Sequence, residues 1–222
     1  MHSTPVEVVG EGRDRGGVVL VGEVCGIDSA LRGWAAALVN EGFFVAMPDL
    51  WARYGGVPQL DSPDAVLAAV ARLDDGQAMR DIAAAALRLP RGRPRVVLGF
   101  CIGGLYARLA SATVPGFAAA VEFYGRVVYP TLTPQKPAQP LDLLPGRTCP
   151  LLCHFGETDP IAPPHHVDEL QRRLAAQPIP SLVYRYPSVG HAFMNPARAG
   201  YSAEASTLAW ARTRRFLDEI ID

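Results

Sequence analysis

Short apolar runs alternate along this chain with longer alanine- and leucine-rich segments, and that alternation limits the possible folds more than any other feature. The runs are only a few residues long and show little alternation of polar with apolar side chains, as expected of strands covered on both faces. They comprise residues 17–23, 43–48, 95–99, 119–124, 151–155 and 182–186. Helices between successive strands favour right-handed parallel crossovers. The pattern therefore predicts a three-layer α/β sandwich with a mostly parallel sheet and helices on both faces.

The segments between the runs are typical of helices. Ser29 is the candidate N-cap of the first helix, and Ser62 followed by Pro63 is an N-terminal signal for the second. Residues 74–76, Asp-Asp-Gly, are expected to break the second helical segment in two. The predicted helices comprise residues 29–40, 61–89, 102–110, 165–176 and 201–221.

Length and composition set further limits on the protein. With 222 residues, the chain is expected to form one domain, residues 1–222. Residues 128–150 hold six prolines and are predicted to be an irregular excursion over the surface. Apolar residues make up 49% and charged residues 19%, which excludes a disordered chain. The net charge of −1 argues against a partner bound through phosphate neutralisation, so no nucleic acid is expected.

Neither a membrane nor a metal is expected as a partner. No apolar run approaches the roughly 18–20 residues that a membrane span needs. The N-terminus lacks a charged start followed by an apolar stretch, so we expect a cytoplasmic protein without a secretory signal. The four cysteines do not have the spacing of a zinc site.

The strongest chemical signal lies where a predicted strand meets a predicted helix. Residues 99–103 read Gly-Phe-Cys-Ile-Gly, a nucleophile-elbow pattern with Cys101 in the place of the usual serine. A nucleophile in such a strained turn needs small flanking residues, which the two glycines supply. The helix N-terminus favours a thiolate, and the N–H of Ile102 is placed to bind an oxyanion. These features predict that Cys101 is a catalytic nucleophile.

Two further residues follow in the order nucleophile, acid, histidine that accompanies such an elbow. Asp159 follows the predicted strand 151–155, and His191 follows the strand 182–186. The carboxyl ends of parallel strands meet at one edge of the sheet, so the aspartate can orient the histidine and the histidine can pair with the thiol. His154, at the end of a strand, is expected to be a hydrogen-bonded structural group.

Each of these residues also has a simpler interpretation. Cys101 could be a buried cysteine at a tight turn, Asp159 could start a turn before a proline, and His191 could be a capping or solvent-facing histidine. A further alternative is a ligand-binding or redox-sensing protein in which Cys25 and Cys101 form a switch.

Several motifs resemble those of the dienelactone hydrolase family over nearly the whole chain. They are the elbow GFCIGG, the acid loop HFGETD, the histidine loop GHAF, the closing segment YSAEASTLAWARTRRFLDEI, the GEVCG after the first strand and the MPDLWAR after the second. The resemblance implies an α/β-hydrolase fold without a large cap domain and without a metal or organic cofactor. It also implies carboxylic ester hydrolysis in the degradation of aromatic compounds.

The resemblance assigns roles to further residues. Glu23 matches a glutamate that contacts the thiol in the resting enzyme, although it could simply cap a solvated strand end. The N–H of Val24 would join that of Ile102 in binding the oxyanion. Arg53 matches an arginine that binds the substrate carboxylate, a task that suits the planar guanidinium fork. It could instead pair with Glu23 when no substrate is present, or be a solvated loop arginine.

The chain also departs from the family pattern. Asn195 stands where some members have a second arginine, so the double-arginine clamp is incomplete, although Arg198 is near enough in sequence to substitute. Cys25 stands where an aromatic residue is common, which changes the shape of the pocket on that side.

The expected function is a cysteine-dependent hydrolase that opens a dienelactone-like lactone or enol ester through a thioester, giving a maleylacetate-type product. The expected substrate is a small, anionic ester or lactone, and the protein is expected to be a monomer or weak oligomer. The alternative is a broader carboxylesterase or thioesterase that acts on neutral or activated esters with the same triad.

Overall fold

The computed structural model describes residues 4–221, which contain seven strands, six α-helices and two short 3-10 helices. The strands are β1 Val6–Val9, β2 Gly16–Val21, β3 Phe43–Pro48, β4 Arg95–Phe100, β5 Ala119–Phe123, β6 Leu151–Gly156 and β7 Ser181–Tyr186. The helices are α1 Ser29–Asn40, α2 Pro63–Arg72, α3 Asp75–Ala86, α4 Ile102–Thr113, α5 Pro164–Ala175 and α6 Ala203–Ile221, with the 3-10 helices η1 Ala52–Tyr54 and η2 Pro140–Gly146.

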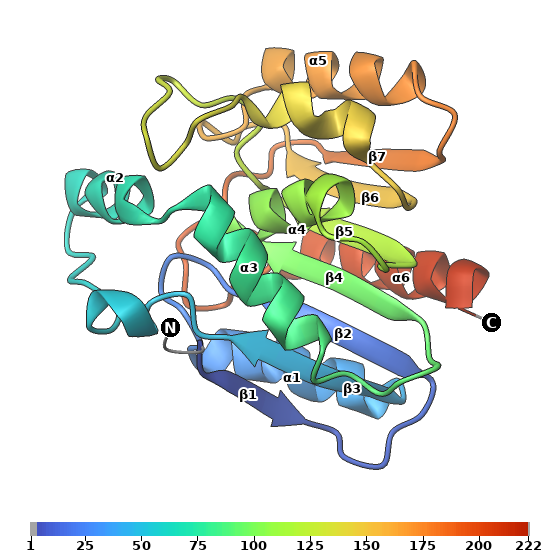
Figure 1. The fold of residues 1–222 in the computed structure, drawn as a ribbon. Helices are drawn as coiled ribbons and strands as arrows, with labels where there is room; N and C mark the ends of the chain where they lie inside the picture. The colour runs from blue at the N-terminus through green and yellow to red at the C-terminus, as the bar shows by residue number, and fades with distance from the viewer. Residues whose placement is uncertain (1–3, 222) are drawn as a thin grey trace.

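All strands form one sheet in the order β1-β3-β2-β4-β5-β6-β7. Strands β2 to β7 pair in parallel, and only the edge strand β1 is antiparallel to its neighbour β3. Helices α1 and α6 cover one face of the sheet, and α3, α4 and α5 cover the other (Figure 1). This is the predicted three-layer arrangement, and it brings the carboxyl ends of the parallel strands to one edge.

The sheet separates two apolar cores because successive strand residues point to opposite faces. Val18 packs with Leu38 on the side of α1 and α6. Val19 packs with Ile82 and Leu105 on the side of α3 and α4. Burying each such side chain contributes about 1.5–3 kcal/mol, which explains why the strands are apolar on both faces.

Local capping signals position the helices. The N-cap of α1 is Asp28, whose carboxylate accepts from the N–H of Leu31 at 2.9 Å, so the prediction of Ser29 as the cap is wrong by one residue. The carboxylate also interacts favourably with the positive end of the helix dipole. Ser62 caps α2 ahead of Pro63, as predicted. Asp74 caps α3, which confirms the predicted break between the two helices.

Residues 128–150 do more than cross the surface. The segment is irregular, as its prolines predict, but Leu141 and Leu144 are buried. The ammonium group of Lys136 is also buried and donates to the carbonyl of Leu73 at 2.7 Å and to Asp75 at 2.8 Å. The prediction of a surface excursion is therefore wrong for the part of the segment that anchors it to α3 and α4.

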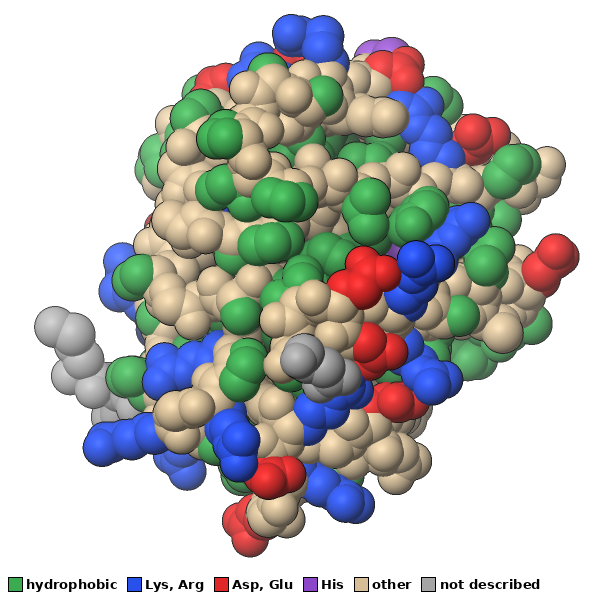
Figure 2. Space-filling view, turned by 90° about the vertical axis from the view of Figure 1, so that its right-hand side faces the viewer, with side chains coloured by type: hydrophobic (Ala, Val, Ile, Leu, Met, Phe, Trp, Pro, Cys, Tyr) green, Lys and Arg blue, Asp and Glu red, His purple; other side chains and the backbone are tan. Residues whose placement is uncertain are grey.

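The face at the amino ends of the parallel strands carries interspersed positive and negative side chains, with no large patch of one sign (Figure 2). No helix within residues 4–221 combines the length and the apolar character that crossing a membrane requires.

Candidate active site

Three side chains that are distant in sequence meet at the carboxyl edge of the sheet. Cys101 lies between β4 and α4, Asp159 follows β6, and His191 follows β7. The Nε2 atom of His191 is 3.2 Å from the sulfur of Cys101, and its Nδ1 atom is 2.7 Å from a carboxylate oxygen of Asp159. The other oxygen of Asp159 accepts from the N–H of Ile161 at 2.7 Å. The aspartate is thus fixed from one side and can hold the imidazole from the other.

The elbow places Cys101 in the left-handed region, at φ 55° and ψ −119°. A Cβ atom on Gly99 would overlap the carbonyl oxygen of Gly103, and one on Gly103 would overlap those of Val21 and Gly22. Only glycine fits at both positions, because the elbow, the helix and β2 approach one another at backbone distance. This close approach of the backbones explains why the motif has glycine at both positions. The turn directs the sulfur of Cys101 away from the sheet.

The electrostatics of the site favour a protonated His191. Burial by itself would lower the pKa of His191, but the negative charge of a Cys101 thiolate and the hydrogen bond to Asp159 outweigh it and raise this pKa to about 10. An imidazolium beside the sulfur can stabilise a thiolate nucleophile and can also donate a proton to a leaving group. Acyl transfer through a cysteine requires both.

Glu23 follows β2 and lies beside this group, with 9% of its side chain exposed. Its carboxylate accepts from the hydroxyl of Tyr124 and from the side-chain amide of Asn195, both at 3.0 Å, and Arg198 lies 3.5 Å away. A solvated strand cap is therefore excluded as its role in this conformation. The sulfur of Cys101 contacts His191, so among the described residues the expected contact between Glu23 and the thiol is not observed.

Cys25 is a free cysteine whose sulfur lies 3.2 Å from both Asp28 and the guanidinium of Arg198. Burial and the negative charges of Glu23 and Asp28 raise the pKa of Cys25 to about 12. A thiol held in this protonated state reacts slowly, which argues against a switch with Cys101.

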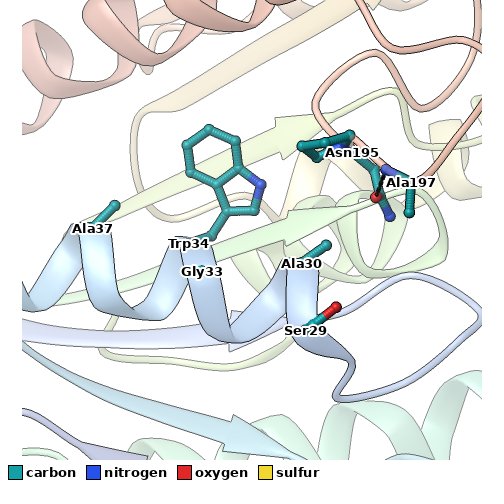
Figure 3. Close-up of a pocket in the computed structure, with 8 residues that line it drawn as sticks. Ser29, Ala30, Gly33, Trp34, Ala37, Asn195 and Ala197 are labelled. Atoms are coloured by element: carbon teal, nitrogen blue, oxygen red, sulfur yellow. Dashed lines mark hydrogen bonds between the residues drawn. The ribbon is translucent and has the colours of Figure 1, made fainter.

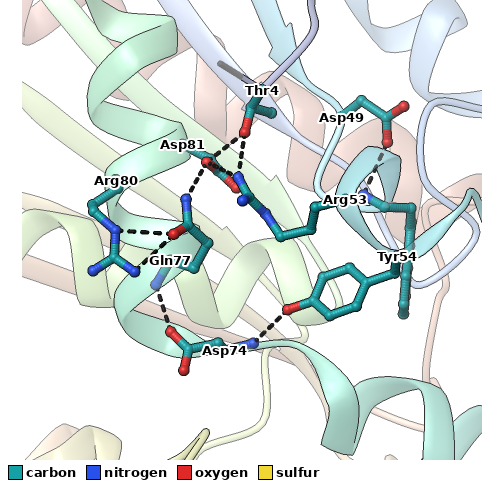
Figure 4. A network of polar contacts seen from close by, with 9 residues as sticks. Thr4, Asp49, Arg53, Tyr54, Asp74, Gln77, Arg80 and Asp81 are labelled. Carbon is teal, nitrogen blue, oxygen red and sulfur yellow. Dashed lines mark hydrogen bonds and ion pairs between the residues drawn. The ribbon is translucent and has the colours of Figure 1, made fainter. Parts of the chain in front are cut away.

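Arg53 is committed to a different set of contacts from those expected. Its guanidinium is 2.7 Å from Asp81, a carboxylate with 5% of its side chain exposed, and 2.6 Å from the hydroxyl of Thr4 (Figure 4). Gln77 donates to the same carboxylate at 2.8 Å. The alternative pairing of Arg53 with Glu23 is not observed, because Arg198 lies beside Glu23 and Asp81 pairs with Arg53.

The thiol opens into a cavity of about 110 Å³ that Arg53 does not line. Its walls are mostly apolar side chains of α2 and the neighbouring loops, and they also include Arg126. The lining residues are Val66, Leu67, Val70, Cys101, Ile102, Arg126, Ile161 and His191. A larger cavity of about 400 Å³ lies between α1 and the loop at residues 195–197, beside Trp34, and contains neither the thiol nor the imidazole (Figure 3).

Two residues of the site carry no sequence motif. Tyr124, at φ 43° directly after β5, donates to Glu23 and lies with its ring 5.2 Å from that of His191. Arg126 follows two residues later at the same edge. Their position after a parallel strand is the signal that points to them. Within residues 4–221 no group of three or more metal-ligating side chains is close enough to hold a metal ion.

A nucleophile elbow with an aspartate and a histidine after later strands of a mostly parallel sheet defines an α/β-hydrolase. The chain belongs to the dienelactone hydrolase family, whose model matches residues 6–221. It is 31% identical over 212 residues to the carboxymethylenebutenolidase of Rhodococcus opacus, covering 92% of this chain and 81% of that protein.

Two other relatives agree with this assignment. A Bradyrhizobium protein provisionally assigned as a 2-oxo-3-(5-oxofuran-2-ylidene)propanoate lactonase is 31% identical over 205 residues, covering 90% of this chain and 82% of its own. A Klebsiella pneumoniae structure provisionally assigned as a dienelactone hydrolase superposes with a TM-score of 0.88 at 25% identity, covering 97% of this chain and 93% of the other. The protein is accordingly a hydrolase of carboxylic ester bonds.

Proposed function

We propose that this protein is a cysteine-dependent hydrolase that opens a dienelactone-like lactone or enol ester. The observation that carries the proposal is the continuous contact from Asp159 through His191 to the sulfur of Cys101. The names of its relatives, a carboxymethylenebutenolidase and a lactonase, support enol lactones as the substrate class.

In the first half-reaction the thiolate of Cys101 attacks the carbonyl carbon and forms a carbon–sulfur bond. The oxyanion accepts hydrogen bonds from the N–H groups of Val24 and Ile102; that of Ile102 is the first in α4 and has no partner within the helix. Each such donor is worth about 2.7–4 kcal/mol. The ring carbon–oxygen bond then breaks, the imidazolium of His191 protonates the leaving oxygen, and a thioester remains.

In the second half-reaction His191 takes a proton from water, and the hydroxide attacks the thioester carbon. The carbon–sulfur bond breaks, the acid leaves, and the thiolate and imidazolium are restored. Asp159 holds the ring in the required tautomer throughout. Glu23 positions Tyr124 and Asn195 beside the histidine loop.

An enol leaving group suits this chemistry, because a thiolate is itself a good leaving group and an alkoxide would be expelled less readily.

The alternative is a broader carboxylesterase or thioesterase, which the apolar walls of the cavity around Cys101 favour. Steady-state kinetics with E and Z dienelactone and with neutral p-nitrophenyl esters separate the two. Ring opening is followed by the loss of ultraviolet absorbance. A higher kcat/KM for dienelactone supports the lactonase, and a higher value for neutral esters supports the alternative.

Substitution of the nucleophile tests the assignment of the site. Cys101→Ala is expected to lower kcat for every substrate by about 10⁴-fold or more, the loss seen when a nucleophile of this kind is removed. Cys149→Ala, which removes a buried cysteine outside the site, is the matched control and is expected to keep its activity. Retention of most activity by Cys101→Ala would remove the cysteine from the mechanism.

A further inference from the structure

The cavity that holds the thiol shares a wall with a second cavity. The second has a volume of about 100 Å³ and extends away from Cys101 toward the segment at residues 130–136. Leu67, Val70 and Arg126 line both cavities. Arg126 therefore lies at the junction of the two cavities. It lines the cavity that contains the thiol, and it also lines the second cavity, which could hold the part of a substrate that extends beyond the reacting ester.

Three basic side chains line the two cavities, namely His191, Lys136 and Arg126, and the described lining includes no aspartate or glutamate. Two of the three already have a carboxylate partner: His191 is bonded to Asp159, and the ammonium of Lys136 is bonded to buried Asp75 at 2.8 Å. The guanidinium of Arg126 makes no ion pair or side-chain hydrogen bond with any residue among 4–221. It is the one lining charge there without a counterion.

Other arginines near the site are held elsewhere. Arg53 would have to leave the nearly buried carboxylate of Asp81, and an unpaired buried carboxylate is costly. Arg198 is shared between Glu23 and Cys25. Neither of the two lines the cavity around Cys101.

We propose that Arg126, and not Arg53, holds the carboxylate of an anionic ester or lactone and so determines the preference of the enzyme for anionic substrates. This inference rests on the proposed function for its substrate chemistry. The planar fork of a guanidinium binds a carboxylate through two parallel hydrogen bonds. Tyr124 and Gly125 form the turn after β5 that places Arg126 at the same edge as the thiol. The carboxylate would lie at the junction while the ester carbonyl lies at Cys101.

The kinetic test compares Arg126→Met with the wild type on anionic dienelactone and on neutral p-nitrophenyl acetate. Arg72→Met, which removes an exposed arginine at the end of α2, is the matched control. Arg126→Met is expected to lower kcat/KM for dienelactone by about 10- to 100-fold, mainly through KM, as for the loss of a charge-assisted hydrogen bond. The neutral ester is expected to change less than about twofold in both variants.

A second test does not depend on turnover. Iodoacetate and iodoacetamide both alkylate the Cys101 thiolate with loss of iodide, but only iodoacetate carries a carboxylate. Mass spectrometry of the Cys101 peptide gives the two rate constants. Their ratio, iodoacetate over iodoacetamide, is expected to fall about tenfold or more in Arg126→Met and to stay within about twofold in Arg53→Met and Arg72→Met.

The two tests separate the failure of this inference from the failure of the proposed function. An unchanged alkylation ratio in Arg126→Met, or a fall in Arg53→Met instead, overturns the role of Arg126 whatever the enzyme hydrolyses. A wild type that hydrolyses neither ester, but whose alkylation ratio falls in Arg126→Met, overturns the proposed function and supports anion binding by Arg126.

Discussion

At the scale of single residues, the backbone of Cys101 lies in a region that cysteine seldom adopts, at φ 55°. Such a conformation costs about 1–3 kcal/mol and persists only where the surroundings enforce it. Here the strand before it, the helix after it and the hydrogen bond from its N–H to the carbonyl of Phe123 at 3.0 Å fix the turn. The strain leaves the sulfur exposed to the imidazole of His191.

The pKa of His191, which the negative charge of Cys101 and the hydrogen bond to Asp159 raise, is expected to set the alkaline limit of activity. The working form holds the imidazolium, so kcat/KM is expected to fall as the pH rises through about 10, the pKa to which this environment raises His191. Asp159→Asn removes one of the causes that raise the pKa of His191. It should therefore move the alkaline limb of the pH–rate profile to lower pH and lower kcat by about 10⁴-fold. An alkaline limb that stays at the same pH in Asp159→Asn would show that Asp159 does not raise the pKa of His191.

The roles proposed for Cys101, Asp159 and His191 were accessible from the sequence because a motif and a fixed chain order mark them. The partner of Arg53 was not, because Asp81 lies 28 positions further along and no local pattern joins the two. Arg126 carries no motif either. Only the rule that side chains after parallel strands gather at one edge points to it.

At the scale of elements, two helix glycines provide a matched pair. Gly103 in α4 lies against the backbone of β2, whereas a Cβ atom on Gly33 in α1 would meet no atom within 4 Å. Gly103→Ala is expected to lower the free energy of unfolding by about 3 kcal/mol or more and to lower activity, because the elbow must shift. Gly33→Ala is expected to raise the free energy of unfolding by about 0.5–1 kcal/mol. Urea denaturation measures both, and equal effects would contradict the account of the elbow.

Most elements follow from local patterns. The helix Ser29–Asn40 and the strand Phe43–Pro48 begin and end where the apolar periodicity places them. Strand β1 was not predicted, because four partly buried residues at an edge give little apolar signal. The anchoring of residues 128–150 was missed for another reason: burial of Lys136 depends on Asp75, which lies far away in the chain.

At the scale of the whole molecule, His154 joins the sheet to the last helix. It is buried, and its ring nitrogens are 2.8 Å from the hydroxyl of Tyr186 and 3.1 Å from that of Thr213 in α6. Burial and the positive charge of Arg212 lower the pKa of His154 to about 3. The expected role of a hydrogen-bonded structural group agrees with these contacts.

This histidine is expected to make the folded protein sensitive to acid. Its pKa is about 3 when folded and about 6.5 in an unfolded chain, so below pH 6.5 the unfolded state binds the extra proton. Stability should therefore fall as the pH drops from about 6.5 toward 3, by up to about 1.4 kcal/mol per pH unit from this group. Urea denaturation of the wild type and of His154→Gln across pH 5–7 checks this, since the variant should show the smaller slope.

The central claim is that the ester is hydrolysed through a thioester on Cys101. Acid quenching during turnover of p-nitrophenyl acetate, followed by mass spectrometry of the intact protein and its peptides, tests it directly. We predict one acetyl group on the peptide that contains Cys101, removed by hydroxylamine and absent from Cys101→Ala. Turnover with the acetyl group on another residue, or with no acylated enzyme while Cys101→Ala remains active, would contradict the claim.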